Sequence, residues 1–405
     1  GVSKIGYNAF RNCSKLVFIS IPESVTEIDS YALNTTGWYK KQTDGVVYAG
    51  NVLYKYKGTM PLDAAIEIKE GTISISQSAF FDCSNLASLT IPGSVVSIGN
   101  YAFGGCTSLR ELTLKDGNDT LSLGYNNYNW NSSSDNQGES LFYHCPLERI
   151  YLGRNLKYET GAQYGFSPFY NKSELISVNI GDGVCSMGHY AFSNCSSIST
   201  IKIPDRVIEL GDYAFCNCCS LTSINIPDRL NSIGHHAFYG CNSLTSIIIP
   251  KSVEEIGPNA FNGCAGELMV NCNIPSSSSN EGGVFYNNKF TKISIGNDVT
   301  SIGDYAFCNS KNLASVIIPA SVIQIGKYAF YGCYYIHSLT IGSGVRSIGY
   351  NAFNFPDKVI WLTNTPPSGY NIAKGNINYV ANEQYTGLSN AKIYPYLSSM
   401  FEVDG

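Results

Sequence analysis

Cysteine is the residue type in this chain with the widest range of possible chemistry, because a thiolate can bind zinc, form a disulfide or attack a carbonyl. The chain of 405 residues holds fourteen cysteines. Cys216, Cys218 and Cys219 lie close together, but no second cluster completes a tetrahedral zinc site. Nine cysteines instead recur at one fixed position of a sequence repeat: Cys13, Cys83, Cys106, Cys145, Cys195, Cys218, Cys241, Cys264 and Cys333. Such regularity indicates packing, so we expect free, buried thiols there. The state of the others is left open: Cys185, Cys216, Cys219, Cys272 and Cys308.

The other residue types that carry out catalysis show no arrangement that indicates an enzyme. None of the histidines stands in an H-E-x-x-H motif or at metal-ligand spacing: His144, His189, His235, His236 and His337. No nucleophile elbow, phosphate-binding loop or dinucleotide-binding motif occurs between a strand and a helix, and the carboxylates are scattered over turns. The sequence therefore predicts a protein that is not an enzyme and that holds no metal or cofactor.

The elements that must position all these residues are the coils of a repeat. An Ala-Phe pair returns with a spacing of 23 residues, and we call its Phe the anchor and count positions from it. After anchor Phe215, Ile224 and Ile226 alternate in an L-x-x-L-x-I strand pattern, and Pro227 ends the strand because it lacks an N–H. A fixed period of this length predicts a solenoid, in which each coil buries its apolar face only against its neighbours. The anchors of Ala-Phe pairs are Phe10, Phe80, Phe103, Phe192, Phe215, Phe238, Phe261, Phe307, Phe330 and Phe353.

The repeat sets the expected domain organisation. Residues 1–362 should form one solenoid domain of about 15 coils, interrupted by insertions near 34–65, 115–140, 153–168 and 273–283. Within the first insertion, alternating runs at 44–48 and 52–56 flank Ala49-Gly50-Asn51, which predicts a β-hairpin. A degenerate coil there should place Tyr54 or Tyr56 near the anchor position. Residues 363–405 leave the period, and we expect them to cap the last coil.

The repeat I-G-x-Y-A-F-x-x-C-x-x-L-x-x-I-x-I-P-x-x-V resembles the BspA-like leucine-rich repeat of bacterial surface proteins. The resemblance covers roughly residues 1–362. It implies an α/β solenoid, a right-handed leucine-rich-repeat superhelix that is mostly β and irregular structure. In that family short parallel strands line the concave face and short 3-10 or helical turns lie behind them. The resemblance further implies a secreted or surface-anchored adhesin that binds proteins of a host or of other cells.

The composition fits a recognition surface outside the cell. Charged residues make up 14% of the chain, the net charge is −5, and tyrosine is abundant with 29 copies. Tyr, Ser and Asn dominate protein-binding surfaces such as antibody paratopes, although Tyr213, Tyr305 and Tyr328 also fit a role as core residues of the repeat. No run of Lys or Arg predicts binding to nucleic acid, and no apolar run is long enough to span a membrane. Val2, Ile5 and Gly6 already match the end of a coil, so we expect the chain to be a fragment.

The candidate binding residues lie where the repeat is interrupted and on the strands beside it. The outward positions of the regular strands hold mostly Ser and Thr, which seldom dominate binding energy. Residues 115–166 instead concentrate aromatic and amide side chains, and the adjoining strands add charge. The predicted ligand-binding residues are Tyr125, Tyr128, Trp130, Tyr164, Glu111, Thr113, Arg149 and Tyr151.

Three functions remain open at this point. The first is a monomeric, non-catalytic scaffold that binds proteins at the cell surface or in the extracellular space. The second is a glycan-binding module in which the aromatic rings of the insertions stack on sugars. The third is a passive stalk that presents another domain. A protein is the more strongly indicated partner, because Tyr, Trp and Arg dominate the energetics of protein interfaces.

Overall fold

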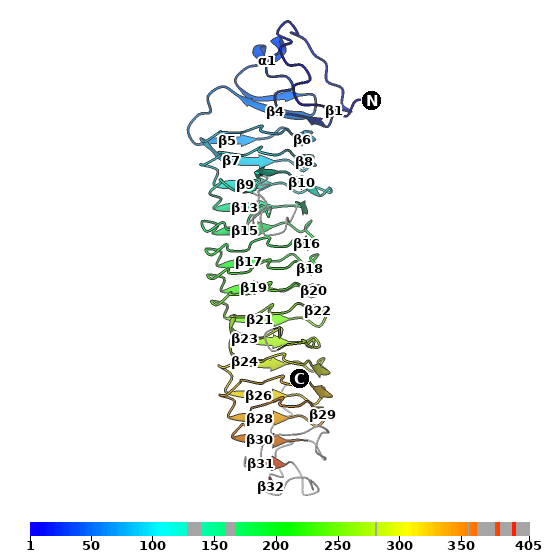
Figure 1. The fold of residues 1–405 in the computed structure, drawn as a ribbon, viewed down its shortest axis with the longest axis vertical. Coiled ribbons are helices and arrows are strands. Elements are labelled where there is room, and N and C mark those ends of the chain that lie inside the picture. Colours follow the sequence, from blue (N-terminus) through cyan, green and yellow to red (C-terminus); the bar gives the residue numbers. More distant parts are fainter. Residues whose placement is uncertain are drawn as a thin grey trace. The chain divides into compact units, whose positions relative to one another are not determined.

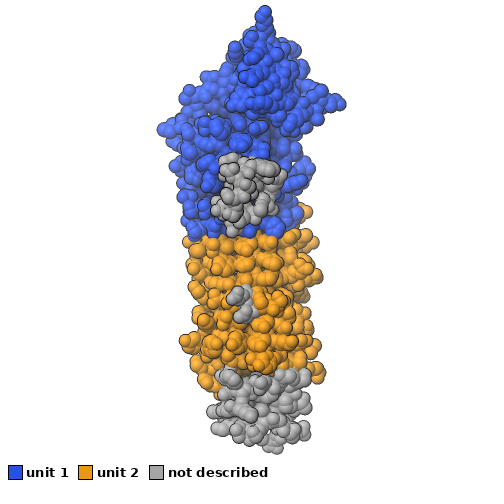
Figure 2. Space-filling view, viewed as in Figure 1, with its two compact units in different colours: residues 1–198 blue, residues 199–405 orange. Residues whose placement is uncertain are grey.

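The computed structural model describes residues 1–127, 139–158, 167–279, 282–354, 356–362, 377–380 and 391–393. The chain is a parallel β-solenoid of about 15 turns with almost no helix, which confirms the predicted fold class. It divides into two compact units, residues 1–198 and residues 199–405 (Figure 2). Within each unit the strands of successive coils stack on one another (Figure 1).

Each coil contributes one longer strand to a parallel sheet. These strands follow the L-x-x-L-x-I pattern, with apolar residues turned inward and Ser, Thr or charged residues turned outward. In unit 1 they are β5 (Ala64–Glu67), β7 (Leu86–Ile91), β9 (Glu111–Leu114), β13 (Arg149–Leu152) and β15 (Ser177–Ile180). In unit 2 they are β17 (Thr200–Lys202), β19 (Ser223–Asn225), β21 (Ser246–Ile249), β23 (Ala265–Val270), β24 (Lys289–Ile295), β26 (Ser315–Ile318), β28 (Ser338–Ile341) and β30 (Lys358–Trp361). Within 363–405, β31 (Ile377–Val380) and β32 (Ala391–Ile393) extend the same parallel ladder.

A second ladder of very short strands, which the sequence did not predict, runs behind the first. In unit 1 it comprises β1 (Lys4–Ile5), β2 (Glu27–Ile28), β6 (Ser74–Ile75), β8 (Ser97–Ile98), β10 (Leu121–Leu123), β14 (Leu156–Lys157) and β16 (Ser186–Met187). In unit 2 it comprises β18 (Glu209–Leu210), β20 (Ser232–Ile233), β22 (Glu255–Ile256), β25 (Ser301–Ile302), β27 (Gln324–Ile325) and β29 (Ser347–Ile348). This ladder and simple turns replace the expected helical turns, and α1 (Gly37–Lys41) is the one helix among the described residues.

Two left-handed residues in most coils explain why helical turns do not form. In the coil of Phe215, Tyr213 and Asn217 flank the anchor with φ of 56° and 57°. The position after the anchor is taken by Asn, Asp or Gly throughout, which are the residue types that tolerate positive φ. The position before it is often Tyr, as at Tyr305 and Tyr328, whose rings stack 4.9 Å apart and are half-buried. These tyrosines therefore lie between core and surface.

The anchors form continuous columns of stacked rings inside each unit. In unit 2, Phe238 packs between Phe215 and Phe261 with centroid distances of 5.6 and 5.3 Å, and it is fully buried. The backbone follows the rings, since Phe238 N donates to Ala260 O of the next coil at 2.8 Å. Each coil is thus bonded to the next at the long strand, at the short strand and at the anchor.

The recurring cysteine position has a specific role in this stacking. The Cys264 thiol donates to the backbone carbonyl oxygen of Phe238, the anchor one coil earlier, at 3.0 Å. Ser310 replaces cysteine in its coil and donates to Phe285 O at 3.3 Å. The same bond to the preceding anchor is made by Cys106, Cys145, Cys195, Cys241 and Cys333. The position therefore selects a small donor that pairs a buried carbonyl.

All fourteen cysteines are free in the structure. We expect thiol titration in denaturant, on protein kept free of reducing agent after purification, to find the nine repeat-position thiols unbridged. Side chains in a ladder point side by side rather than at one another, so a bridge needs backbone movement. A count of two or fewer free thiols would show instead that the ladder is a covalent staple.

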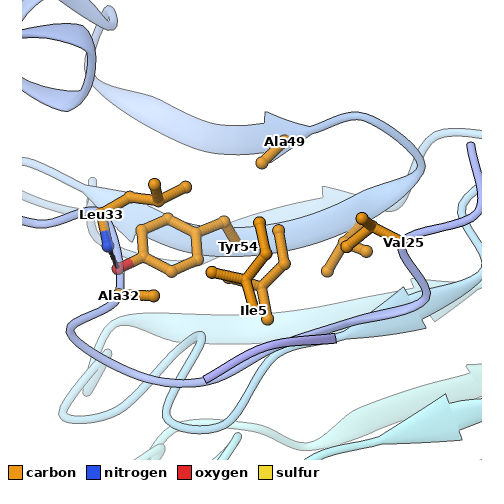
Figure 3. Packing of buried hydrophobic residues seen from close by; sticks show 8 residues of the cluster. Ile5, Val25, Ala32, Leu33, Ala49 and Tyr54 are labelled. Carbon is orange, nitrogen blue, oxygen red and sulfur yellow. Dashed lines mark hydrogen bonds between the residues drawn. The ribbon is translucent and has the colours of Figure 1, made fainter. Parts of the chain in front are cut away.

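The first insertion is the predicted hairpin, and it enters the core. β3 (Gly45–Ala49) pairs antiparallel with β4 (Val52–Lys57). Tyr54 lies in the apolar cluster of the first coils, where its hydroxyl accepts from Leu33 N at 2.9 Å and donates to Asn34 Oδ1 (Figure 3). Tyr56 lies beside anchor Phe80 with ring centroids 6.3 Å apart. Both tyrosines therefore lie near the anchor column, as the period predicts.

Candidate functional site

Four of the predicted binding residues lie together on the outward face of the unit 1 sheet. Strands β9 and β13 pair in parallel, with Arg149 opposite Glu111 and Tyr151 opposite Thr113. The alternate residues of the same strands point inward and are buried: Leu112, Leu114, Ile150 and Leu152. Because the inward residues fix the register, the outward four occupy two neighbouring rows of one rigid surface.

Charged side chains join these rows into a network. Arg149 Nη1 lies 3.3 Å from Glu111 Oε1 and 3.5 Å from Glu148 Oε2. Arg110 Nε lies 3.2 Å from Glu148 Oε1. The side chains of Arg149 and Glu111 are each 53% exposed, so their ion pair contributes about 0–1 kcal/mol to folding. A partner can therefore exchange these pairs for its own charges at small cost. We call Arg110, Glu111, Thr113, Glu148, Arg149 and Tyr151 the charged face.

Tyr151 is held in place at the end of its strand. Its hydroxyl donates to Asp116 Oδ1 at 2.8 Å. This hydrogen bond, followed by burial and the charges of Asp116 and Asp182, raises the pKa of Tyr151 above its usual value. A Cβ atom at Gly181 would lie 2.7 Å from Asp116 Oδ1 and 3.0 Å from the Tyr151 hydroxyl, so glycine is needed for this approach. The ring is thereby ordered before any partner binds, which lowers the entropy cost of binding.

A second charged cluster lies on the same sheet. Lys115 reaches across two coils to Glu67 Oε1 at 2.8 Å and Glu70 Oε1 at 3.1 Å. The hydrogen bond from Lys115 lowers the pKa of Glu67, and the bonds to both carboxylates raise the pKa of Lys115. All three side chains are exposed, so this cluster extends the mixed charge of the surface beyond β9 and β13.

The predicted aromatic residues are not brought into this group. Tyr125 belongs to β11 (Tyr125–Asn127), which pairs antiparallel with β12 (Glu139–Ser140) and follows the short-strand ladder instead. Its ring packs edge-on against Tyr101 at 6.2 Å, and its backbone N–H donates to Asn100 Oδ1. Tyr128, Trp130 and Tyr164 lie outside the described residues. The predicted insertion at 115–140 also contains β10, which continues the short-strand ladder through Leu123.

Two buried cations beside the charged face were missed by the sequence reasoning. Arg154 is 1% exposed, and its guanidinium donates to the carbonyl oxygens of Pro92, Gly93 and Val95. Burial lowers the pKa of Arg154, and the charge of Asp119 opposes that change. Nothing in its sequence position indicates this role, since the arginine follows an interrupted coil.

Lys172 is the second buried cation, and the repeat does contain a signal for it. It lies three residues after anchor Phe169, which is the cysteine position, and it donates to Phe142 O at 2.6 Å. It also donates to Tyr143 O and Cys145 O. Burial lowers the pKa of Lys172. The ammonium thus makes the bond that a thiol makes elsewhere and pairs two further carbonyls.

The described part of the chain offers no metal centre and no membrane-spanning helix. No three His, Cys, Asp or Glu side chains among the described residues are arranged to hold a metal ion. No described helix has the length and apolar character that a bilayer requires. The chemistry that the charged face can perform is therefore recognition by hydrogen bonds, charge and aromatic contact.

The repeat matches a known family model along most of the chain. The model of the BspA type Leucine rich repeat region fits in six copies over residues 1–43, 54–160, 162–282 and 278–363. The chain belongs to the BspA-type leucine-rich repeat family. The resemblance seen in the sequence is confirmed. A comparison with curated proteins gives no match.

Solved structures of leucine-rich repeat proteins support the fold of this BspA-type chain. A leucine-rich repeat protein from Bacteroides ovatus is 21% identical, with a TM-score of 0.50 over 97% of this chain and 88% of that one. A leucine rich cell surface protein from Faecalibacterium prausnitzii is 19% identical, with a TM-score of 0.32 over 86% of each chain. The pneumococcal vaccine antigen PcpA is 16% identical, with a TM-score of 0.38 over 87% of this chain and 98% of that one. At these identities the likeness extends to the fold alone.

Proposed function

We propose that this protein is a non-catalytic, adhesin-like scaffold, secreted or at the bacterial cell surface, that binds a protein partner through the charged face. Membership of a leucine-rich repeat family supports a protein-interaction role, and solved proteins with the repeat include a cell surface protein. The observation that carries the proposal is the placement of Arg149 and Tyr151 at successive outward positions of β13. Arg and Tyr are the residue types that most often dominate interface energy.

The surroundings of these two residues fit a protein surface as partner. The charged face mixes both signs within hydrogen-bond distance, which matches the mixed charge of most folded proteins. A strongly basic face would favour nucleic acid, and this face pairs each arginine with a glutamate. We propose that the chain acts as a monomer that presents this face to another protein.

The test is binding to a panel of immobilised extracellular-matrix proteins by surface plasmon resonance, with a glycan array run in parallel. The double variant Arg149→Ala/Tyr151→Ala should lose about 30-fold in affinity for the matrix protein that the unaltered chain binds, since hot-spot side chains contribute ~2 kcal/mol or more. Both side chains are exposed enough that the melting temperature should stay unchanged.

A matched control exists in unit 2. Lys292 and Ser294 occupy the same two outward positions of β24, and Lys292 pairs with Glu267 at 3.4 Å. Lys292→Ala/Ser294→Ala should bind as the unaltered chain does. If only the control variant loses affinity, the partner binds unit 2. Glycan binding without protein binding would favour the module built on Tyr125, Tyr128, Trp130 and Tyr164, and no binding to either would favour a passive stalk.

A further inference from the structure

The short-strand side of unit 1 holds a polar pocket that is separate from the charged face. Its volume is about 510 Å³, within the usual range for small-molecule sites. It lies where the β3–β4 hairpin interrupts the ladder, so the β1–β2 pair forms one wall and β6 and β8 form the other. The polar side chains that line it are Lys4, Glu27, Asp29, Ser76, Gln77, Ser97 and Asn100.

The first wall is rigid because its strands are anchored in the core beneath. Ile5 and Ile28 turn inward into the apolar cluster that also contains Val25 and Tyr54 (Figure 3). The residues before them, Lys4 and Glu27, alternate outward. Their side chains meet at 2.5 Å, and Lys4 Nζ also lies 3.3 Å from Asp29 Oδ1.

The opposite wall presents amides and hydroxyls. Asn100 Oδ1 accepts from Tyr125 N, which fixes the amide and leaves its NH₂ group to donate elsewhere. The side chains of Gln77 and Ser97 are half-buried and make no hydrogen bond to any described residue. Gly99 brings the two segments together, because a Cβ there would lie 2.5 Å from Gln77 N. The wall is therefore closely packed and carries unused donors and acceptors.

A hydroxyl in the lining points independently to a ligand. Ser76 is 4% exposed, and its Oγ is buried without a hydrogen-bond partner in the structure. An unpaired buried hydroxyl costs about 1–3 kcal/mol, and most such groups in native proteins are paired. A polar group brought into the pocket is a natural partner for it.

We propose that this pocket binds one ring of a neutral, polyhydroxylated ligand, namely a sugar residue. A sugar hydroxyl both donates and accepts, so neighbouring hydroxyls can accept from the Gln77 and Asn100 amides and donate to Glu27 and Asp29. The two carboxylates outweigh the single charge of Lys4, which disfavours anions. The proposal concerns a surface and a ligand class that differ from those of the charged face, so either can fail alone.

The experiment measures binding of five named sugars by saturation-transfer NMR: D-glucose, D-galactose, D-mannose, N-acetyl-D-glucosamine and D-glucuronate. We expect at least one neutral sugar to bind with a Kd of about 1 mM, typical of a single ring held by few groups. Ser97→Tyr should fill the pocket and weaken binding at least tenfold. The control is Ser347→Tyr at the same repeat position of β29, which should leave binding unchanged.

A second variant keeps the proposal testable if Ser97→Tyr fails to fold. Gln77→Ala removes a half-buried side chain without hydrogen bonds, so the fold should persist while sugar binding weakens about tenfold. The proposal is overturned if none of the five sugars binds the unaltered chain. It is equally overturned if D-glucuronate binds more tightly than every neutral sugar, or if Ser97→Tyr and Ser347→Tyr bind alike.

Discussion

The protein is expected to lose stability steeply above about pH 9, because its buried thiols cannot ionise while the chain is folded. Burial raises the pKa of Cys145, Cys195 and Cys333 to about 12. Their stabilisation is complete below the thiol pKa of the unfolded chain, near 8.5–9, and is lost as the pH rises toward 12. Burial raises the thiol pKa in the same direction at Cys106, Cys241 and Cys264.

The size of this effect follows from the number of thiols. Each loses about 1.4 kcal/mol of stabilisation per pH unit, so the six together lose on the order of 8 kcal/mol per unit. That is comparable to the whole stability of a typical domain. Burial lowers the pKa of Lys172, which acts in the opposite direction but is a single group.

Urea unfolding at pH 8, 9 and 10 under reducing conditions measures the predicted loss. The control is Cys145→Ser/Cys264→Ser/Cys333→Ser, which keeps the donors and removes three of the ionising groups, as Ser310 does naturally. Its free energy of unfolding should fall about half as steeply with pH. Equal slopes for the variant and the unaltered chain would show that thiol ionisation does not control alkaline unfolding.

Phe238→Ala should cost about 3–5 kcal/mol in the free energy of unfolding of unit 2. The ring is fully buried between Phe215 and Phe261, and neighbouring coils cannot collapse into the space without breaking their own ladder bonds. Denaturant unfolding followed by circular dichroism measures this loss. Thr222→Ala is the control, because Thr222 is exposed and bonds only to the carbonyl of Ser199, so it should change stability by less than about 0.5 kcal/mol. Equal midpoints for the two variants would contradict the assignment of repeat positions.

The sequence predicts the regular parts of this fold because their signals repeat. The anchors, the long strands and the hairpin around Gly50 were all located from periodicity and alternation. The short-strand ladder was not, because two residues such as Ser232–Ile233 are too few to show a period. Positions like Lys172 and Arg154 also escape prediction, since their partners are backbone carbonyls that any sequence provides.

The candidate site was predictable in the same measure. Arg149 faces Glu111 because both hold the same repeat position, and parallel stacking aligns equal positions. The ion pair with Glu148 and the bond from Tyr151 to Asp116 depend on side-chain geometry that no sequence pattern fixes. The role of Tyr128, Trp130 and Tyr164 stays a prediction.

The three rows of hydrogen bonds between coils determine how a unit of this solenoid responds to force. The chain enters unit 2 at one coil and leaves it at another, so tension on its ends is directed along the stack and loads one inter-coil boundary at a time. The bonds of each boundary open like a zipper rather than shearing together. Each released coil of 23 residues lengthens the chain by roughly 75 Å. A stretched unit therefore gives way in small, equal steps and dissipates a sudden pull while its remaining coils stay folded.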